Sequence, residues 1–231
     1  MKLLALDTAS GQCSVALWLD GQLAFRGVAT AREHAQLLLP MIDALLAEAG
    51  LTLRALDGIA FGRGPGSFTG VRIAAAVTQG LAAGADLPVL PVSSLRALAA
   101  QARRLVTEAE GAAPDGALLA CMDARMGELY WAVFAPGLEA APEVVGPPQQ
   151  LLIPPHLRAA AAAGKGLAAW PDIAVSLQLP PARVFAGAEP HAREVAWLAA
   201  QDLAQGASWL DAALAQPVYL RDQVVQAAKT T

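Results

Sequence analysis

The sequence predicts an α/β protein built from two related domains. Its 231 residues are 55% apolar and only 16% charged, a composition typical of a compact globular chain that buries one or two cores. Short strand-like runs alternate with amphipathic helical segments, and this order begins again after residues 108–114. We therefore predict an N-terminal domain over residues 1–110 and an abbreviated C-terminal domain over residues 111–231. The final helix or tail of the second domain can pack back on the first domain.

Local signals predict each element of the first half. The Asp20-Gly21 pair between two strand-like runs indicates a hairpin, because both turn residues need positive φ. Apolar residues at i, i+4 spacing before Gly50 indicate an amphipathic helix that ends at this glycine. Ser93 is a suitable N-cap for a later helix. In order along the chain, we predict strands over residues 2–8, 13–19 and 22–29, a helix over 33–49, a strand over 58–62, a helix over 71–85, a strand over 88–92 and a helix over 93–107.

The second half repeats this order in weaker form. Asp7 and Gly11 align with Asp123 and Gly127, because each aspartate leaves a strand, a glycine follows four residues later, and a second strand comes next. The matching elements around these two turns suggest a duplicated unit. In order, we predict strands over residues 117–123 and 128–135, a third strand near residue 144, and helices over 156–163 and 191–205.

The two aspartate turns are candidates for nucleotide binding. Turns rich in small residues can point backbone N–H groups at a phosphate, and two such turns across a cleft would clamp a nucleotide. The aspartates would then hold a divalent ion through water. The simpler alternative is that aspartate and glycine only close two hairpins, and we favour it on the sequence alone. The candidate residues are Asp7, Thr8, Ser10, Asp123 and Arg125.

The loop over residues 62–70 (GRGPGSFTG) connects a predicted strand to a predicted helix. Free N–H groups at helix N-termini often bind anions, so Gly64, Gly66 and Ser67 are candidates for anion or partner binding. The loop is not a P-loop, because no Lys-Ser or Lys-Thr pair follows the glycines. The alternative is a tight backbone passage that allows the following helix to dock, and the sequence favours neither explanation.

Small residues form a stripe on the helix that follows this loop. Ala76, Gly80 and Gly84 recur at four-residue spacing, which allows a second helix to approach closely. A glycine inside a helix costs about 1 kcal/mol relative to alanine. We therefore expect a close neighbour to compensate, which would be either a helix of the same chain or one of another chain.

Composition and spacing argue against several classes of function. The three histidines lie far apart, so we predict neither a metal site nor a catalytic triad, and His34 is expected to lie on the surface. The net charge is −4 and there are three lysines, so the chain is not expected to bind RNA alone. No segment has the composition of a membrane-spanning helix, and an acidic residue at position 7 comes too early for a secretory signal. We expect a cytoplasmic protein in which Cys13 and Cys121 are buried thiols.

Five stretches of the chain resemble the TsaB (YeaZ) family. The loop over residues 62–73 and the turn over residues 123–131 are its most specific motifs, whereas residues 139–190 match poorly. The resemblance implies an actin/Hsp70/sugar-kinase-like fold of two related domains. The stretches are residues 4–9 (LALDTA), 32–34 (REH), 62–73 (GRGPGSFTGVRI), 123–131 (DARMGELYW) and 217–221 (PVYLR).

The resemblance also implies a function in tRNA modification. Members of this family pair with their paralogue TsaD, which transfers threonylcarbamoyl to the adenosine beside the anticodon, and the ATPase TsaE joins them. TsaD-like enzymes carry an H-x-x-x-H metal motif where this chain has Ser94 and Leu98, which cannot replace two imidazole ligands. The segment over residues 164–166 also lacks the fuller glycine-rich adenosine loop. We therefore expect no catalytic and no metal-binding residues, no intrinsic cofactor, and ATP or ADP only at an interface with partners.

Three functions follow as alternatives. The first is a non-catalytic scaffold that pairs with TsaD and TsaE, reaches tRNA only through the complex, has no membrane contact and forms a homodimer when TsaD is absent. The second is an autonomous ATP-dependent kinase-like enzyme of the same superfold. The third, a glycoprotease, lacks a nucleophile–base pair in this sequence. For the scaffold, the expected interface on the first two helices comprises His34, Leu38, Ile42, Val71, Ala76 and Gly80.

Overall fold

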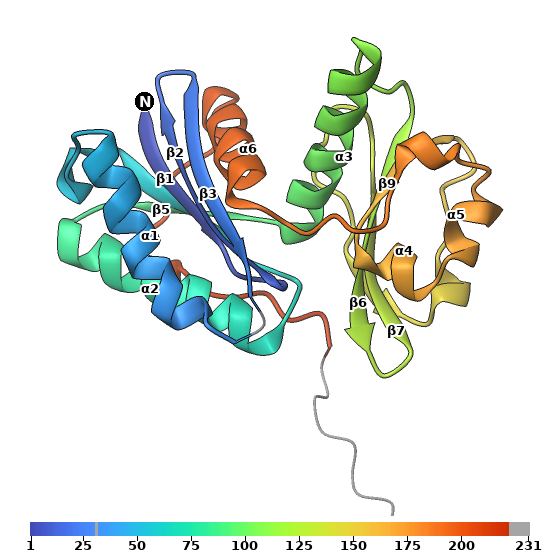
Figure 1. Cartoon of the computed structure of the whole chain (residues 1–231), viewed down its shortest axis with the longest axis horizontal. Coiled ribbons are helices and arrows are strands. Elements are labelled where there is room, and N and C mark those ends of the chain that lie inside the picture. Colours follow the sequence, from blue (N-terminus) through green and yellow to red (C-terminus); the bar gives the residue numbers. More distant parts are fainter. Residues whose placement is uncertain (31, 222–231) are drawn as a thin grey trace, which may run out of the picture.

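The computed structural model describes residues 1–30 and 32–221, and it consists of two α/β lobes that lie side by side (Figure 1). The first sheet has the strand order β3-β2-β1-β4-β5. Strands β2 and β3 continue β1 in antiparallel fashion, whereas β4 and β5 run parallel to β1. The strands are β1 (Lys2–Asp7), β2 (Gln12–Leu19), β3 (Gln22–Ala29), β4 (Gly58–Gly62) and β5 (Val89–Val92).

The second sheet has the order β10-β9-β6-β7-β8 and repeats the topology of the first. Strands β7 and β8 continue β6 in antiparallel fashion, and β9 and β10 run parallel to β6. This repetition confirms the predicted fold class, an actin/Hsp70/sugar-kinase-like α/β fold of two related lobes. The strands are β6 (Ala117–Arg125), β7 (Glu128–Phe134), β8 (Val144–Gly146), β9 (Ala159–Ala163) and β10 (Val184–Phe185).

The second lobe is abbreviated in its helices. Two long helices, α1 and α2, connect the strands of the first sheet, whereas the corresponding connections of the second sheet hold two 3-10 turns and two five-residue helices. None of the helices in the described residues is long and apolar enough to cross a membrane. The helices are α1 (His34–Glu48), α2 (Phe68–Ala85), α3 (Ser94–Glu110), α4 (Lys165–Ala169), α5 (Asp172–Ser176) and α6 (Ala192–Ala204), with 3-10 turns η1 (Leu53–Ala55), η2 (Pro148–Gln150), η3 (Pro181–Arg183) and η4 (Ala212–Leu214).

Each half of the chain supplies one helix to the other lobe. Helix α3 follows the last strand of the first sheet but packs on β6, β7 and β9, whereas α6 follows the second sheet and packs on β1, β2 and β4 (Figure 1). The two helices also pack against each other between the sheets. The central core therefore contains side chains from both lobes, for example Leu3, Leu98, Leu118 and Leu198.

Two further cores lie on the outer faces of the sheets. Helices α1 and α2 cover the outer face of the first sheet, and α4 and α5 cover the outer face of the second. The layers thus follow each other as α1 and α2, first sheet, α6 and α3, second sheet, α4 and α5 (Figure 1). In this order, no further layer of the described residues covers the far side of α1 and α2.

The prediction of a helix over residues 156–163 is wrong, because residues 159–163 form strand β9. This run of five alanines has high intrinsic helix propensity. Four of the five are buried, however, in a strand that pairs in parallel with β6 on one side and β10 on the other. Burial between two strands decides the conformation here, and local propensity does not.

Candidate functional site

A cleft of about 910 Å³ lies between the two lobes. Its walls are the turn after β1, the loop before α2, the turn between β6 and β7, and the C-terminal segment over residues 218–221. The two aspartate turns therefore do face one cleft. Of the predicted nucleotide- and anion-binding residues, the cleft brings together Ser10, Gly66, Ser67, Asp123 and Arg125.

Asp7 is buried beneath this cleft and does not face it. Its Oδ2 accepts a hydrogen bond from Ser94 Oγ at 3.0 Å, and its Oδ1 accepts one from the Ala9 backbone N–H at 2.9 Å. A Cβ on Gly62 would collide with Oδ2. Burial raises the pKa of Asp7 to about 6. The prediction that Asp7 reaches a nucleotide or a water-bound ion is therefore wrong in this conformation.

Thr8 is a structural residue as well. It is fully buried, and its hydroxyl donates a hydrogen bond to the backbone oxygen of Gly70 at 2.7 Å. The first aspartate turn thus joins β1 to α3 through Asp7 and to α2 through Thr8. These two side chains hold elements together, which corrects their assignment as ligand-binding residues.

The second aspartate turn is open to solvent. Asp123 Oδ1 accepts a hydrogen bond from the Arg125 backbone N–H at 2.8 Å, and the two side chains form an ion pair at 3.0 Å. The Arg125 side chain is 85% exposed. Arg125, Met126 and Gly127 all have positive φ, as a tight turn requires. The contacts of Asp123 with Arg125 therefore stabilise the β6–β7 hairpin itself, as expected if this aspartate only closes a hairpin.

Close packing explains three glycines of the loop over residues 62–70. A Cβ would collide with the Asp7 carboxylate at Gly62, with the Ala9 backbone oxygen at Gly66, and with the Thr8 backbone oxygen at Gly70. The loop therefore lies directly on the turn after β1, and Ser67 caps α2 by accepting from Gly70 N at 3.4 Å. Gly64 is buried with a φ of 94°. Close packing of the loop on the turn after β1 therefore explains why Gly62, Gly66 and Gly70 lack side chains. Anion binding at this loop remains a prediction.

An ion pair between Lys165 and Glu189 lies in the wall of the cleft. The Glu189 side chain is only 13% exposed and lies against Gly11, where a Cβ would be 3.2 Å from its Oε2. Glu189 Oε2 has no hydrogen-bond partner among the described residues. Sequence reasoning did not identify this pair, because the two residues carry no local motif and meet only through the fold.

The C-terminal segment joins the two lobes on one side of the cleft. Val218 N donates a hydrogen bond to Arg63 O at 2.8 Å in the first lobe. Arg221 forms an ion pair with Glu128 and donates to Ala124 O at 3.3 Å in the second lobe. The segment therefore connects the loop before α2 to the turn between β6 and β7.

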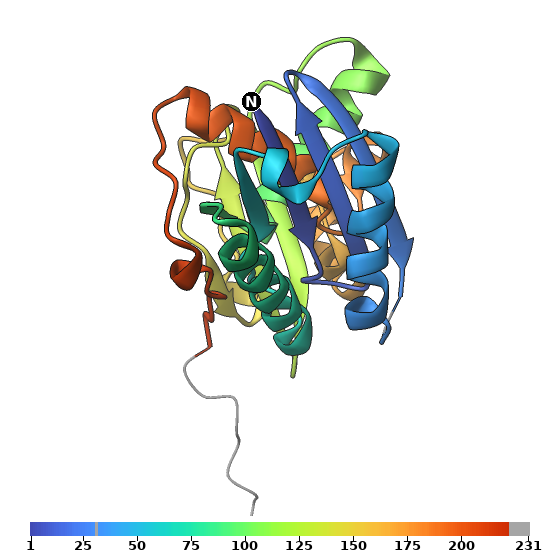
Figure 2. The same cartoon turned by 90° about the vertical axis from the view of Figure 1, so that its left-hand side faces the viewer.

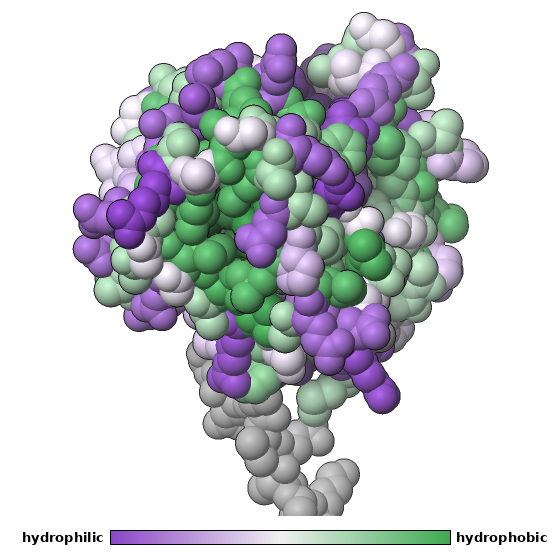
Figure 3. Space-filling model, turned by 60° about the vertical axis from the view of Figure 1, so that its left-hand side comes forward, coloured by the Kyte–Doolittle hydropathy of each residue, from purple (hydrophilic) through white to green (hydrophobic). Residues whose placement is uncertain are grey.

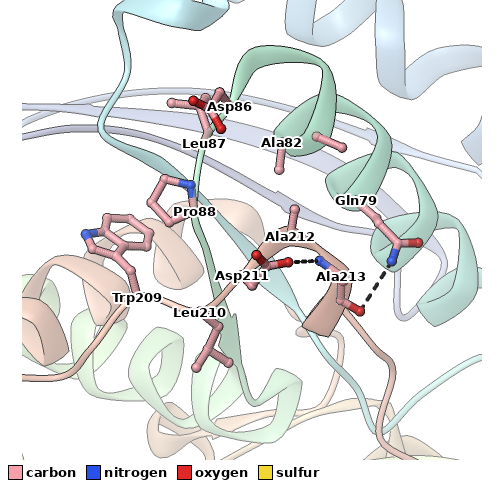
Figure 4. Close-up of a pocket in the computed structure, with 11 residues that line it drawn as sticks. Gln79, Ala82, Asp86, Leu87, Pro88, Trp209, Leu210, Asp211, Ala212 and Ala213 are labelled. Carbon is pink, nitrogen blue, oxygen red and sulfur yellow. Dashed lines mark hydrogen bonds between the residues drawn. The ribbon is translucent and has the colours of Figure 1, made fainter.

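A pocket of about 820 Å³ lies where the preceding stretch of chain, residues 209–213, packs along α2 (Figure 4). Leu210 forms two backbone hydrogen bonds with Val89 at 2.9 Å, which cover the edge of β5. Gln79 of α2 donates a side-chain hydrogen bond to Ala213 O at 3.3 Å. The pocket lies between α2 and this stretch of chain, and Trp209 and Leu210 line it on one side.

Helices α1 and α2 lie side by side on the outer face of the first sheet (Figure 2). Leu38 and Ile42 are buried against this sheet, whereas Val71 is buried at the start of α2 against the loop at Gly64. His34 is also buried, and its Nε2 donates a hydrogen bond to Ser10 O at 2.9 Å. Leu38 and Ile42 cannot contact a partner directly in this conformation. His34 and Val71 are buried as well, although both line the interlobe cleft, so the expectation that His34 lies on the surface is wrong. The apolar periodicity identified the inward stripe of α1, which the chain's own sheet covers.

The small residues of α2 are exposed instead. Ala76 and Gly80 lie on its outward side, and a Cβ on Gly80 or Gly84 would meet no atom within 4 Å. A close helix of the same chain, one of the two predicted explanations for these glycines, is therefore absent among the described residues. Figure 3 shows a continuous apolar area over α1 and α2. Its apolar side chains include Leu37, Leu39, Ile73, Val77 and Leu81. We call this surface the α1–α2 face.

No group of three or more His, Cys, Asp or Glu side chains in the described ranges is arranged to hold a metal ion. Ser94, at the position of a TsaD-like metal ligand, is fully buried and hydrogen-bonded to Asp7.

Known proteins resemble this chain along almost its whole length. A protein-family model described as TsaD, tRNA N6-adenosine threonylcarbamoyltransferase, matches residues 24–229. The tRNA threonylcarbamoyladenosine biosynthesis protein TsaB of Escherichia coli K12 is 39% identical over 240 residues, covering 97% of this chain and 96% of that protein. The TsaB protein of Haemophilus influenzae is 50% identical over 131 residues, covering 57% of this chain and 52% of that protein.

Two solved structures agree with this similarity. A Pseudomonas aeruginosa protein described as uncharacterized, with similarity to peptidase YEAZ, has a TM-score of 0.81 and 41% identity, covering 95% of this chain and 99% of that one. YeaZ from Pseudomonas aeruginosa has a TM-score of 0.79 and 40% identity with the same coverage. The sequence match to TsaB over almost the whole chain and the similarity to both solved structures show that this chain belongs to the TsaB (YeaZ) family.

Proposed function

We propose that this chain is a non-catalytic cytoplasmic subunit in the synthesis of threonylcarbamoyladenosine in tRNA, and that it binds TsaD through its α1–α2 face. The observation that supports this most directly is the unfilled stripe at Ala76, Gly80 and Gly84. Glycine inside a helix costs about 1 kcal/mol relative to alanine, and no group of the described chain approaches closely enough to compensate. A helix of another protein would supply the missing contact.

A paralogue is a suitable partner for this face. Because the chain matches the TsaD family model over residues 24–229, we expect TsaD to carry helices equivalent to α1 and α2. Two equivalent faces can pack on each other with pseudo-twofold symmetry, as the two copies in a homodimer do. For the same reason we expect this chain to form a homodimer when TsaD is absent.

The contacts inside the cleft favour a non-catalytic subunit. Asp7 is buried under Gly62 and bonded to Ser94, and Leu98, at the second ligand position of the TsaD-like metal motif, is fully buried. We propose that the isolated chain has no cofactor of its own and that ATP or ADP binds only where it meets TsaD and TsaE. With a net charge of −4, the chain would contact tRNA through the complex.

Substitution at Gly80 tests the interface. We expect Gly80→Leu to abolish binding to TsaD in size-exclusion chromatography and calorimetry, because a branched side chain would separate the two helices. Gly80→Ala should raise the stability of the free chain by up to about 1 kcal/mol and weaken pairing less. Ala169→Leu, at an exposed position of α4, is the matched control and should pair normally. Normal pairing by Gly80→Leu would refute the assignment of this face.

An autonomous ATP-dependent kinase-like enzyme is the second candidate, because both aspartate turns face the interlobe cleft. Calorimetry of the purified chain with ATP and magnesium, followed by a turnover assay, separates the two functions. The proposed function predicts neither heat of binding nor ATP consumption by the isolated chain, and tight binding with turnover would replace it by the kinase.

A further inference from the structure

The structure assigns Arg72 a specific role at the edge of the α1–α2 face, where we propose that it binds a carboxylate side chain of the partner subunit. This inference rests on the proposed pairing with TsaD and adds a polar, specificity-determining contact to an otherwise apolar surface.

Arg72 is held in a fixed position by side chains from two distant parts of the chain. Its guanidinium carbon lies 3.5 Å from the centroid of the Phe68 ring and 5.4 Å from that of Tyr219. Its Nε donates a hydrogen bond to the Tyr219 hydroxyl at 2.7 Å. The backbone bond from Val218 N to Arg63 O holds Tyr219 in place. The guanidinium thus loses much of its freedom before any partner arrives, which lowers the entropic cost of binding.

The two Nη groups of this guanidinium have no hydrogen-bond partner among the described residues, which leaves them available for a ligand. Several other arginines of the chain are paired with carboxylates, for example Arg63 with Glu143 and Arg96 with Asp202. Arg72 forms no ion pair with any described residue, although it is exposed. A guanidinium fork matches a carboxylate in geometry, with two parallel N–H···O bonds. An immobilised fork without an acidic neighbour is therefore ready to bind a carboxylate from outside the chain.

The position of Arg72 on α2 places this fork beside the proposed interface. Ala76 and Gly80 follow it at i+4 and i+8, so the three residues lie along one side of the helix. Phe68 and Tyr219 are 46% and 45% exposed, so large aromatic groups surround the guanidinium. Arginine and tyrosine residues dominate the binding energy of many protein interfaces when a partner desolvates them.

The surroundings favour a protein carboxylate over a phosphate of RNA. Nucleic-acid binding needs several cations that contact successive phosphates. Three basic side chains of the cleft wall are already paired with carboxylates, namely Arg125 with Asp123, Arg221 with Glu128 and Lys165 with Glu189. The side of Arg72 toward the α1–α2 face is apolar. A single fixed cation at the rim of an apolar face suits one acidic side chain on a facing helix.

The test measures the affinity of the full chain for purified TsaD by calorimetry. We expect Arg72→Ala to weaken pairing at least about 30-fold, because removing one partner of an interface charge pair leaves the other buried and unpaired. Arg72→Lys should lie between Arg72→Ala and the wild type, because an ammonium lacks the fork. Tyr219→Phe, which removes only the hydroxyl that orients Nε, should cause a smaller loss than Tyr219→Ala.

The matched control is Arg158→Ala. Arg158 is an exposed arginine that directly precedes β9 in the second lobe, away from the α1–α2 face. Its removal should change affinity for TsaD by less than about twofold. Asp222→Asn examines an acidic residue that lies outside the described residues, and it should leave pairing unchanged. A loss with Asp222→Asn equal to that of Arg72→Ala would overturn the inference, because Arg72 would then serve its own chain.

Other outcomes separate this inference from the proposed function. If the wild-type chain does not bind TsaD, the proposed function fails and the role of Arg72 fails with it. If the wild type binds and Arg72→Ala binds equally well, only the role of Arg72 is wrong. If Arg72→Ala pairs normally but the assembled complex binds tRNA more weakly, the arginine contacts phosphate instead. A large fall in the melting temperature of free Arg72→Ala would also overturn the inference, in favour of a structural role.

Discussion

The two aspartate turns have equivalent positions in the two lobes but different surroundings. Asp7 ends β1 and is fully buried, with Ser94, Ala9 and Gly62 packed around its carboxylate. Asp123 lies near the end of β6, and its described partner is the highly exposed Arg125. An aspartate at an equivalent position is thus a packing anchor in the first lobe and part of an open hairpin in the second. The two turns also differ in backbone, since Arg125, Met126 and Gly127 have positive φ and no residue from Asp7 to Gly11 does. An equivalent position at the end of a strand is therefore insufficient to identify a ligand-binding aspartate.

The largest expected effect comes from disturbing the anchor. Gly70→Ala would place a Cβ against the backbone oxygen of Thr8, which cannot move without shifting β1. We expect the free energy of unfolding to fall by about 3 kcal/mol or more, measured by urea denaturation. The matched variant in the second lobe is Gly127→Ala, where φ is 80° and the space is open. It should cost about 1 kcal/mol, from backbone strain alone. Equal losses in the two variants would contradict the comparison.

A second effect of similar size concerns the charge on Asp7. Because burial raises its pKa from 3.8 to about 6, the folded state binds a proton that the unfolded state has released between these values. The contribution of Asp7 to stability is therefore fully present below about pH 4 and is lost as the pH rises through about 6. The loss amounts to about 3 kcal/mol.

Asp7→Asn should remove this pH dependence. Its amide can still accept from Ala9 N and can donate to the hydroxyl oxygen of Ser94, so the packing is kept. Relative to the wild type, the variant should gain about 3 kcal/mol in stability between pH 4 and pH 8, measured by denaturation at each pH. Asp123→Asn is the control for removing a carboxylate from an exposed turn, and it should lack the gain in stability expected for Asp7→Asn. If Asp7→Asn ran parallel to the wild type, Asp7 would not be a buried, raised-pKa group.

Local signals were sufficient for the elements of the first lobe. The Asp20-Gly21 hairpin, the cap at Ser93 and the helix end at Gly50 depend on residues within one turn of each other, and the structure contains all three features. The abbreviated second lobe was predicted from the same signals in weaker form. Strand β9 was not predicted, because five alanines carry no pattern that distinguishes a buried strand from a helix. Its conformation depends on pairing with the neighbouring strands β6 and β10.

Interactions between distant residues could not be predicted. The periodicity of α1 shows that Leu38 and Ile42 share a face, but not whether its own sheet or a partner covers that face. The exchange of α3 and α6 between lobes leaves no local trace in the sequence. The same applies to Arg72, whose side-chain partner Tyr219 lies 147 residues away. The sequence therefore indicated helices α1 and α2 as a candidate interface, but the residues on their outward surface could be identified only from the fold.

The smallest expected effect concerns the open turn. Arg125→Ala removes the exposed partner of Asp123, and the backbone N–H that closes the turn remains. Exposed ion pairs contribute little because solvent screens them, so the free energy of unfolding should change by less than about 1 kcal/mol. Arg96→Ala provides the contrast, because its partly buried guanidinium forms hydrogen bonds with Asp202 at 2.6 and 2.8 Å and with Leu138 O at 2.5 Å. If Arg125→Ala destabilised the fold as much as Arg96→Ala, the second turn would also be an anchor. A small effect leaves Asp123 and Arg125 as surface groups of the cleft that a partner subunit can reach without any loss of fold stability.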